Sequence, residues 1–441
     1  MVLAIILFSQ CKKIVEEEVV PNPGPKTFTG SLINPDTNTL KMIYDEEYVI
    51  LAEDLIFSFN PIKELKYLNR IRKIGGDFII EYCDSLQNFA GLDSLVTLNG
   101  DFTVRSNAQL EGFTGLETLE FIRKDFSIVD NANLKAIEGL DRLTRVKGSL
   151  SIQFQNGLED LSGFSTIEVI EGNLLLYSND MITSFRGLDN LKTIWGTILL
   201  SGDNEFTNFE GLESLESIRG GLRISNHSHL QSFKGLENVK YIFGDFEVTY
   251  NPRLKILDQL PLLDSLNGKL IIKGNDSLVT INTLNSIDKI KDDLEIENNP
   301  MLVQINAFEN LEFIAGRLKI SDNPRLLILQ GFNKLITVAE GVSLTNNHDL
   351  QSLESFSSLR TIREKVYVSN NFSLTSLDGL EALNFIDGDL TIIGHDNLTD
   401  FCALQNIISG NGVLGVINIS GNLYNPTTDD IVLGNCSYNG K

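Results

Sequence analysis

Apolar and polar positions along this chain follow a unit of 24 residues that recurs without insertion. Beginning at Gly76, 14 consecutive units keep one register through the unit that begins at Gly388. If the first residue of a unit is position 0, then positions 2, 4, 10, 13, 16 and 19 are apolar in all of them. Such a repeat indicates stacked coils, because one unit of this length cannot enclose a core alone.

The spacing within a unit predicts the local structure. Positions 2 and 4, such as Leu174 and Leu176, alternate with mostly polar neighbours and predict a short strand with one buried face. The later apolar positions are three residues apart, which fits short straight segments joined by corners rather than a helix. One further unit fits before Gly76. We therefore predict an all-β, parallel solenoid of 14–15 coils, about 65–70 Å long at the usual strand spacing.

Position 7 of the unit is polar, although the other repeat positions expected to face the core are apolar. Its side chains can satisfy turn backbone groups that the coil would otherwise bury unpaired, which predicts a structural ladder. Five units carry Cys83, Gln155, Asp203, His227 and His395 there, and the two histidines are interpreted as structural. The ladder asparagines are Asn107, Asn131, Asn179, Asn251, Asn275, Asn299, Asn323, Asn347 and Asn371.

The recurring string resembles the receptor L-domain family. It is seen in Gly172-Asn-Leu174-Leu-Leu176-Tyr-Ser-Asn179, followed by Ile182, Phe185, Gly187-Leu188, Leu191 and Ile194. The two residues between Asn107 and Leu110 favour this family over ordinary leucine-rich repeats. The resemblance covers residues 52–411 and implies a right-handed β-helix. Animal receptor L-domains have fewer coils and flank cysteine-rich modules, so a tethered bacterial version fits better than a transmembrane receptor.

The N-terminal residues are typical of export. An apolar run, Val2–Phe8, is followed closely by Cys11, as in a bacterial lipoprotein signal over 1–11. Residues 12–27 are rich in Glu and Pro and predict an extended tether. We expect lipid attachment at Cys11 and an outer-membrane, cell-surface location. Because no Lys or Arg precedes the run and Gln10 replaces a small residue, a fragment of an ordinary signal peptide is the alternative.

Both ends of a solenoid need caps, because they expose apolar core and sheet edge. We predict an N-terminal cap over 28–59, with a strand near 48–51, and a C-terminal cap over 402–441. Cys402 and Cys436 are the only cysteines of that tail and are expected to form a disulfide in an exported protein. Cys83 is left as a buried free thiol.

Charge and composition exclude several function classes. The net charge of −23 opposes binding to nucleic acid. Four histidines and four dispersed cysteines argue against zinc or haem, and we expect no cofactor or metal. Gly410-Asn-Gly412-Val-Leu-Gly415 matches a dinucleotide-binding pattern, but the strand-like residues 416–419 follow it where a helix is required.

Carboxylates on the predicted strand face raise the alternative of a glycan-processing enzyme, because glycosidases use paired carboxylates. Here the acidic positions alternate along the stack with cations, for example Glu295 with Lys319 and Glu297 with Lys273. Opposite charges on adjacent coils favour register and solubility over catalysis. The face carries Asp245, Glu247, Asp293, Glu295 and Glu297.

The candidate binding site is an apolar interruption of this polar face. It combines Phe154, Leu175, Tyr177, Trp195 and Leu199, which fall on consecutive coils. An exposed aromatic cluster with a polar rim is typical of recognition of proteins or sugars. The alternative is that these side chains only cover one another. We therefore expect a non-enzymatic binding or adhesion module with a protein or glycan ligand; the alternatives are the glycan-processing enzyme and a passive surface spacer.

Overall fold

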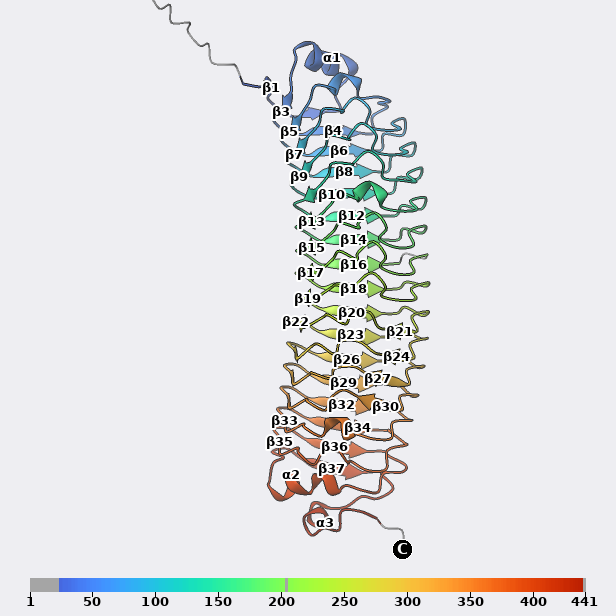
Figure 1. The fold of residues 1–441 in the computed structure, drawn as a ribbon, viewed down its shortest axis with the longest axis vertical. Helices are drawn as coiled ribbons and strands as arrows, with labels where there is room; N and C mark the ends of the chain where they lie inside the picture. Colours follow the sequence, from blue (N-terminus) through green and yellow to red (C-terminus); the bar gives the residue numbers. More distant parts are fainter. Residues whose placement is uncertain (1–23, 203–204, 439–441) are drawn as a thin grey trace, which may run out of the picture.

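The computed structural model describes residues 24–202 and 205–438. They form an elongated stack of parallel coils with one helix at one end and two at the other (Figure 1). The prediction of a parallel β-solenoid with 24-residue repeats is confirmed, since successive strands pair in parallel 24 residues apart through most of the stack. The predicted signal over 1–11, Cys11 and most of the tether over 12–27 lie outside the described residues.

One long sheet, here called the front sheet, holds the strands built from positions 2–5 and lies on the far side of the stack in Figure 1. Each strand pairs with the strands of the coils before and after it, as Leu174 does with Leu150 and Ile198. Its strands are β2 (Leu32–Ile33), β4 (Leu55–Ser58), β6 (Phe78–Glu81), β8 (Phe102–Arg105), β10 (Phe126–Val129), β12 (Leu150–Gln153), β14 (Leu174–Tyr177), β16 (Ile198–Ser201), β18 (Leu222–Ser225), β20 (Phe246–Thr249), β23 (Leu270–Lys273), β26 (Leu294–Glu297), β29 (Leu318–Ser321), β32 (Val342–Thr345), β34 (Val366–Ser369), β36 (Leu390–Ile393) and β37 (Ile417–Ser420).

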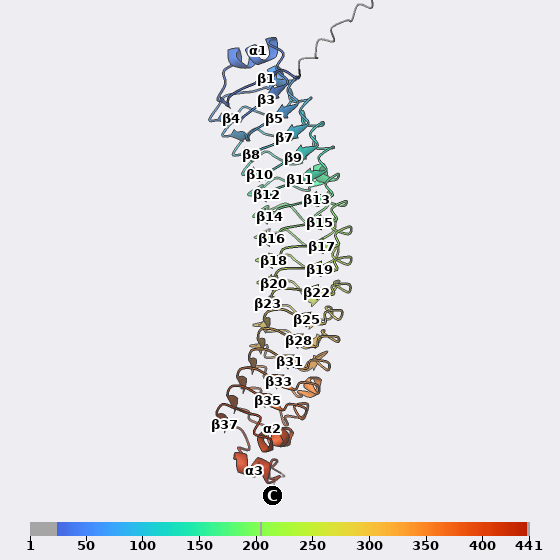
Figure 2. The ribbon, with the colours of Figure 1, turned by 90° about the vertical axis from the view of Figure 1, so that its left-hand side faces the viewer.

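A second sheet, here called the side sheet, runs beside the front sheet and faces the viewer in Figure 2. Within the described residues it has 16 strands of two residues each. They are β1 (Thr27–Phe28), β3 (Ile50–Leu51), β5 (Lys73–Ile74), β7 (Thr97–Leu98), β9 (Phe121–Ile122), β11 (Arg145–Val146), β13 (Val169–Ile170), β15 (Thr193–Ile194), β17 (Ser217–Ile218), β19 (Tyr241–Ile242), β22 (Ser265–Leu266), β25 (Lys289–Ile290), β28 (Phe313–Ile314), β31 (Thr337–Val338), β33 (Thr361–Ile362) and β35 (Phe385–Ile386).

The remaining side of each coil is mostly turns and irregular segments. A short third sheet forms there in the C-terminal half, at the right of Figure 1, from β21 (Ile256–Leu257), β24 (Thr280–Ile281), β27 (Gln304–Asn306) and β30 (Ile328–Gln330). Single 3₁₀ turns occur at η1 (Lys66–Leu68), η2 (Ser162–Phe164), η3 (Glu354–Phe356) and η4 (Cys402–Leu404).

Identical positions of successive coils stack on one another inside the solenoid. The rings of Phe78 and Phe102 are stacked with centroids 5.0 Å apart, and Phe102 stacks on Phe126 at 4.8 Å. The apolar residues at the repeat positions line one continuous core, with Leu174 and Leu176 fully buried. The 24-residue period therefore sets the packing, because it places like side chains in contact.

A residue with left-handed backbone conformation follows every front strand from β4 to β36. This residue is Tyr82 after β6, with φ of 53°, and Gly274 after β23, with φ of 67°. A Cβ on Gly274 would come within 2.6 Å of the Tyr250 ring, so glycine both relieves backbone strain and makes room for that ring. A sharp turn of fixed geometry thus follows each strand.

The N-terminal cap is helix α1 (Thr37–Asp45), which the sequence analysis did not predict. The Asp36 carboxylate accepts the Thr39 backbone N–H at 2.8 Å and so caps the helix. Leu40 and Ile43 are buried on the helix side that packs on the core. Strands β1 to β4 already belong to the two long sheets, so the segment predicted as a cap over 28–59 also contributes to the stack.

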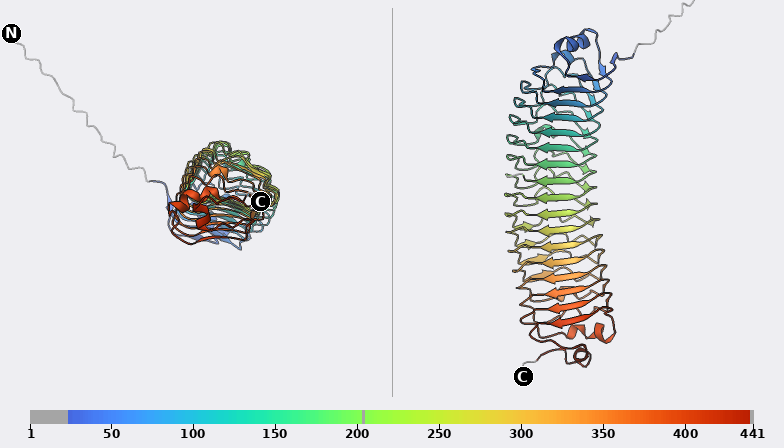
Figure 3. Two further views of the ribbon diagram at one scale, coloured as in Figure 1. Left: turned by 90° about the horizontal axis from the view of Figure 1, so that it is seen from below. Right: turned by 180° about the vertical axis from the view of Figure 1, so that it is seen from behind.

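The C-terminal cap contains α2 (Gln405–Ser409) and α3 (Thr428–Val432), at the bottom of Figure 3, right. Cys402 and Cys436 form a disulfide, and Cys83 is a free, buried cysteine. The front sheet continues to β37, past residue 411, where the sequence analysis ended the solenoid. No helix of the described residues is long and apolar enough to cross a membrane.

Candidate ligand-binding surface

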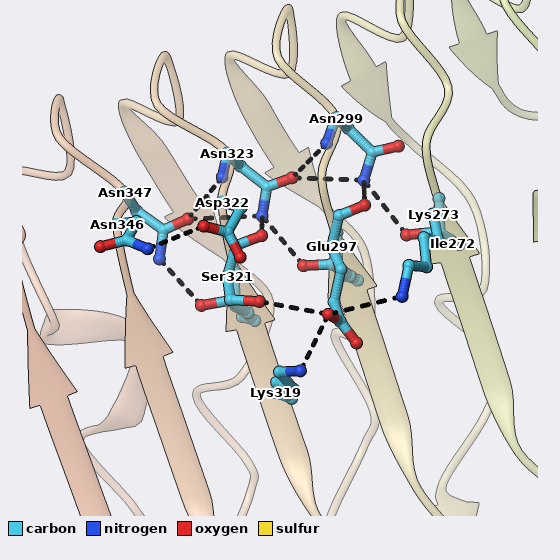
Figure 4. A network of polar contacts seen from close by, with 12 residues as sticks. Ile272, Lys273, Glu297, Asn299, Lys319, Ser321, Asp322, Asn323, Asn346 and Asn347 are labelled. Carbon is cyan, nitrogen blue, oxygen red and sulfur yellow. Dashed lines mark hydrogen bonds and ion pairs between the residues drawn. The ribbon is translucent and has the colours of Figure 1, made fainter. Parts of the chain in front are cut away.

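The ladder asparagines line the inner side of the turns that follow the front strands. The Asn299 side chain accepts the Asn275 backbone N–H at 3.1 Å. Its amide nitrogen donates to the carbonyl oxygens of Ile272 at 3.1 Å and Glu297 at 3.0 Å (Figure 4). Asn323 repeats the pattern one coil further, toward Asn299 and Ile296. Each amide therefore satisfies two backbone groups of the preceding coil, which gives these residues a structural role.

Units without asparagine place other side chains at ladder position 7. Gln155 accepts the Asn131 N–H at 3.2 Å. His395 is buried, its backbone N–H donates to Asn422 at 3.1 Å, and its Nδ1 lies 2.9 Å from the same oxygen. Burial lowers the pKa of His395 below its ordinary value. Asp203 lies outside the described residues, and Asn422 extends the ladder into the C-terminal cap.

A second ladder, here called the outer ladder, runs along position 1, just before each front strand. The Asp77 carboxylate accepts the Asp101 backbone N–H at 2.8 Å, and Asp101 accepts the Asp125 N–H at 3.0 Å. Ser149 and Asn173 continue it. This ladder was not predicted from the sequence, although Asp, Asn, Ser and Thr recur at position 1 and could have revealed it.

Four residues of the predicted apolar patch lie on the front sheet or at its edge. Leu175 and Leu199 are paired in register on β14 and β16, and both are half-buried. Tyr177 lies at the end of β14, where partial burial raises its pKa. Phe154 occupies the left-handed turn after β12 with φ of 56° and is 49 % exposed. The structure thus brings Leu175 and Leu199 together in one row.

Trp195, the fifth predicted residue, belongs to a different group of side chains. It follows β15 of the side sheet and is 45 % exposed. The Arg219 guanidinium, one coil further in the same row, lies 4.9 Å from the centre of its indole ring. Phe243 is next in that row, and its ring stacks on Tyr241 with centroids 6.0 Å apart.

Trp195, Arg219, Tyr241 and Phe243 are here called the side-sheet cluster. Its last three members were not predicted from the sequence, although Arg219 and Phe243 share a repeat position with Trp195. Phe243 and Tyr241 are both exposed. A cation over an indole and two adjacent exposed rings form a surface that can contact planar or apolar groups of a ligand.

The carboxylates considered for catalysis are engaged mainly by cations. Arg223 binds Asp245 at 2.7 Å and Glu247 at 3.1 Å. Lys269 binds Asp293 at 2.8 Å. Lys319 lies opposite Glu295 in register, but its ammonium binds Glu297 at 2.8 Å (Figure 4).

The two neighbouring carboxyl groups, Glu295 and Glu297, differ in their environment. Burial and a hydrogen bond with Glu297 raise the pKa of Glu295. Burial acts to raise the pKa of Glu297 as well, but Lys319, Glu295 and Lys273 together outweigh it and the net pKa is lowered. Within the part of the chain that the structure describes, no group of three or more His, Cys, Asp or Glu could hold a metal ion.

The fold and its surface define a class of protein: a parallel solenoid with a closed apolar core and outer faces that vary from coil to coil. The family model of the receptor L domain matches residues 142–209 and 264–340. This supports the resemblance to that family within these two segments.

Solved structures and curated proteins add little. One solved structure, described as "Crystal structure of TLR13-ssRNA13 complex", is 12 % identical and covers 86 % of this chain and 82 % of that chain. Its TM-score of 0.24 is too low to carry an argument. No curated protein matches the chain.

Proposed function

We propose that this protein is a non-enzymatic, cell-surface module that binds a protein or glycan ligand on the outside of its solenoid. The observation that carries the proposal is the side-sheet cluster, in which Trp195, Tyr241 and Phe243 are exposed beside Arg219. Exposing several large rings costs hydration free energy, and surfaces of this composition are enriched in binding hot spots. The match of residues 142–209 to the receptor L domain includes Trp195 and supports the same proposal.

The front sheet supplies a second apolar contribution to the same middle part of the stack. Leu175 and Leu199 interrupt a face that otherwise carries mostly polar and charged side chains, and Tyr177 and Phe154 stand at its edge. A rigid stack holds such side chains in fixed positions, so little conformational entropy is lost when a ligand binds. The ligand contacted by these residues is proposed to be a protein or glycan of the cell exterior.

We further propose that the module is exported and held at the outer membrane by lipid on Cys11. The support is the position of Cys11 behind an apolar run, together with the disulfide between Cys402 and Cys436, which suits an oxidising compartment. The membrane would then be contacted through the lipid alone.

An enzymatic role finds little support in the charged residues. Asp245, Glu247, Asp293 and Glu297 each bind a lysine or arginine. A glycosidase needs one carboxylate as a proton donor and another as base or nucleophile, and an ion pair keeps a carboxyl group from acting as the donor. The ion pairs therefore favour a role in holding neighbouring coils in register.

The proposal is tested with residues 28–441 on arrays of glycans and of extracellular proteins. The double variant Trp195→Ala with Tyr177→Ala should lower ligand binding by about tenfold or more. Truncating hot-spot rings that a bound ligand covers costs over about 1.4 kcal/mol of binding free energy. Thermal stability should stay unchanged, since both rings are solvent-accessible.

The matched control is Phe121→Ala, which removes an exposed ring of the side sheet outside the cluster. It should bind as the parent chain does. Equal binding by the double variant and the parent would remove the patch hypothesis. Failure of the parent chain to bind any array member or intact cells would favour the passive spacer.

A further inference from the structure

A notch lies in the outer face of the front sheet toward the C-terminal end. Its volume is about 340 Å³, and it crosses β29, β32 and β34. The floor is Gly341 and Ser343, one wall is Arg317 and Lys319, and the opposite wall is Lys365 and Tyr367. The register explains this shape, because Ser343 lies between Lys319 and Tyr367 in adjacent strands.

The notch coincides with a break in the outer ladder. On one side the Asp293 carboxylate accepts the Arg317 backbone N–H at 2.8 Å, and on the other Asp389 accepts the Val416 N–H at 2.7 Å. Between them the ladder positions are Arg317, Gly341 and Lys365, of which none has a side-chain acceptor. The backbone N–H groups of Gly341 and Lys365 therefore face a place where neighbouring coils put a carboxylate oxygen.

The charge of the notch is opposite to that of the protein. Its lining includes three cationic side chains and no carboxylate, although the chain has a net charge of −23. Arg317 and Lys319 are partly neutralised by Glu340 at 3.3 Å and Glu297 at 2.8 Å. For Lys365 no ion pair is found among the described residues. The notch therefore favours an anion, and general repulsion by distant acids is screened beyond about 8 Å at physiological salt.

We propose that the notch binds a carboxylate-bearing sugar residue of an acidic polysaccharide. The carboxylate would take the place that the ladder carboxylates occupy in neighbouring coils, near the Lys365 N–H and the three cations. The exposed Tyr367 ring would lie against the sugar ring, and the Ser343 hydroxyl would bond a sugar hydroxyl.

A peptide fits this place less well than a sugar. Strands β29, β32 and β34 each pair with a strand on both sides, so no strand edge offers backbone hydrogen bonds to an extended peptide. An acidic peptide would have to bind through one side chain alone. The notch is formed by residues apart from the side-sheet cluster, so this inference does not rest on the ligand proposed for Trp195.

The test is calorimetric titration of the chain 28–441 with a trimer of galacturonic acid. The parent should bind the trimer, bind it more weakly as salt rises, and fail to bind its methyl-esterified form. Lys365→Gln and Tyr367→Ala should each weaken binding about tenfold, and Ser343→Glu should abolish it by placing a carboxylate in the notch. Lys192→Gln is the matched control, because it removes an exposed lysine that pairs with Glu168 on another face.

Several outcomes would overturn the proposal. No binding of the trimer by the parent chain would do so, as would undiminished binding by Lys365→Gln and Ser343→Glu with unchanged far-UV circular dichroism. Equal or tighter binding of tetraglutamate would assign the notch to acidic peptides instead. The Trp195→Ala, Tyr177→Ala double variant should bind the trimer as the parent does, which separates this result from that of the proposed function.

Discussion

Two ladders of side-chain hydrogen bonds run along this solenoid, and they tolerate variation very differently. The inner ladder, at position 7, is buried, and nine of its 14 repeat positions are asparagine. The outer ladder, at position 1, also joins a side-chain oxygen to a backbone N–H of an adjacent coil, but of the next coil, whereas the inner ladder bonds the preceding one. Its positions nevertheless include Asp, Ser, Asn, Thr, Gly, Lys and Arg.

Water explains the difference between the two ladders. An N–H group buried without an acceptor costs about 1–3 kcal/mol, whereas an accessible one can bond to solvent. The inner ladder accordingly keeps an amide in ten of its 14 repeat units, nine asparagines and Gln155. The outer ladder can lose its acceptor, as at Gly341, and the freed place becomes available for a ligand. Residues that shape a binding surface can therefore vary at the outer ladder, which water reaches, but not at the buried inner ladder.

The largest predicted effect comes from breaking the inner ladder. Asn299→Leu leaves the Asn275 N–H and the Ile272 carbonyl without their partner, so the free energy of unfolding should fall by about 2–5 kcal/mol. Urea unfolding followed by far-UV circular dichroism measures it. Asn299→Gln should lower the free energy of unfolding much less, because Gln155 fills the same ladder position in another coil. Equal losses for the two variants would contradict the role of the amide.

A smaller effect is expected for the outer ladder. Asp101→Ala removes the acceptor of the Asp125 N–H, but water can replace it, and the change also separates stacked carboxylates. The free energy of unfolding should fall by less than about 1.5 kcal/mol in the same urea experiment. A loss as large as that of Asn299→Leu would show that the two ladders are equivalent and would end the comparison.

The smallest effect is a pH dependence at the ladder histidine His395. Because burial lowers the pKa of His395, the unfolded chain takes up this proton first as pH falls. Its contribution to stability is full above about pH 6.5 and is lost as pH falls through the lower folded pKa, with a slope below about 1.4 kcal/mol per pH unit. The difference in unfolding midpoint between the parent and His395→Asn, followed from pH 7.5 to 5.5, measures it. A constant difference would contradict the assignment.

The features of the fold that recur with the 24-residue period were the most predictable from the sequence. The recurrence of Leu174, Leu176 and their equivalents was enough to predict parallel coils, because stacking in register is the arrangement that buries them. Helix α1 was missed because it occurs once, so its N-cap residue Asp36 does not recur in the sequence as the repeat positions do. The coil of β37 was missed because three extra residues, near 410–412, displace Gly415 and Asn422 from the 24-residue register.

The candidate site was only partly predictable for a related reason. Repeat positions identify which residues share a row, but they do not say which neighbouring rows meet across a corner. Trp195 was therefore grouped with Leu175 and Tyr177 of the front sheet, while the structure places Arg219 over its ring. The notch at Gly341 also escaped notice, since it arises from small residues between large ones in adjacent coils.

By itself the sequence determined the coil, the core and the inner ladder, since each is specified by residue types that recur at fixed spacing. The tertiary structure decided how the ends are closed, which cation meets which carboxylate, and where the outer faces are hollow or aromatic. These features depend on distances between side chains of different rows and coils. Such distances are set by the corners and by packing between coils, which periodicity does not encode.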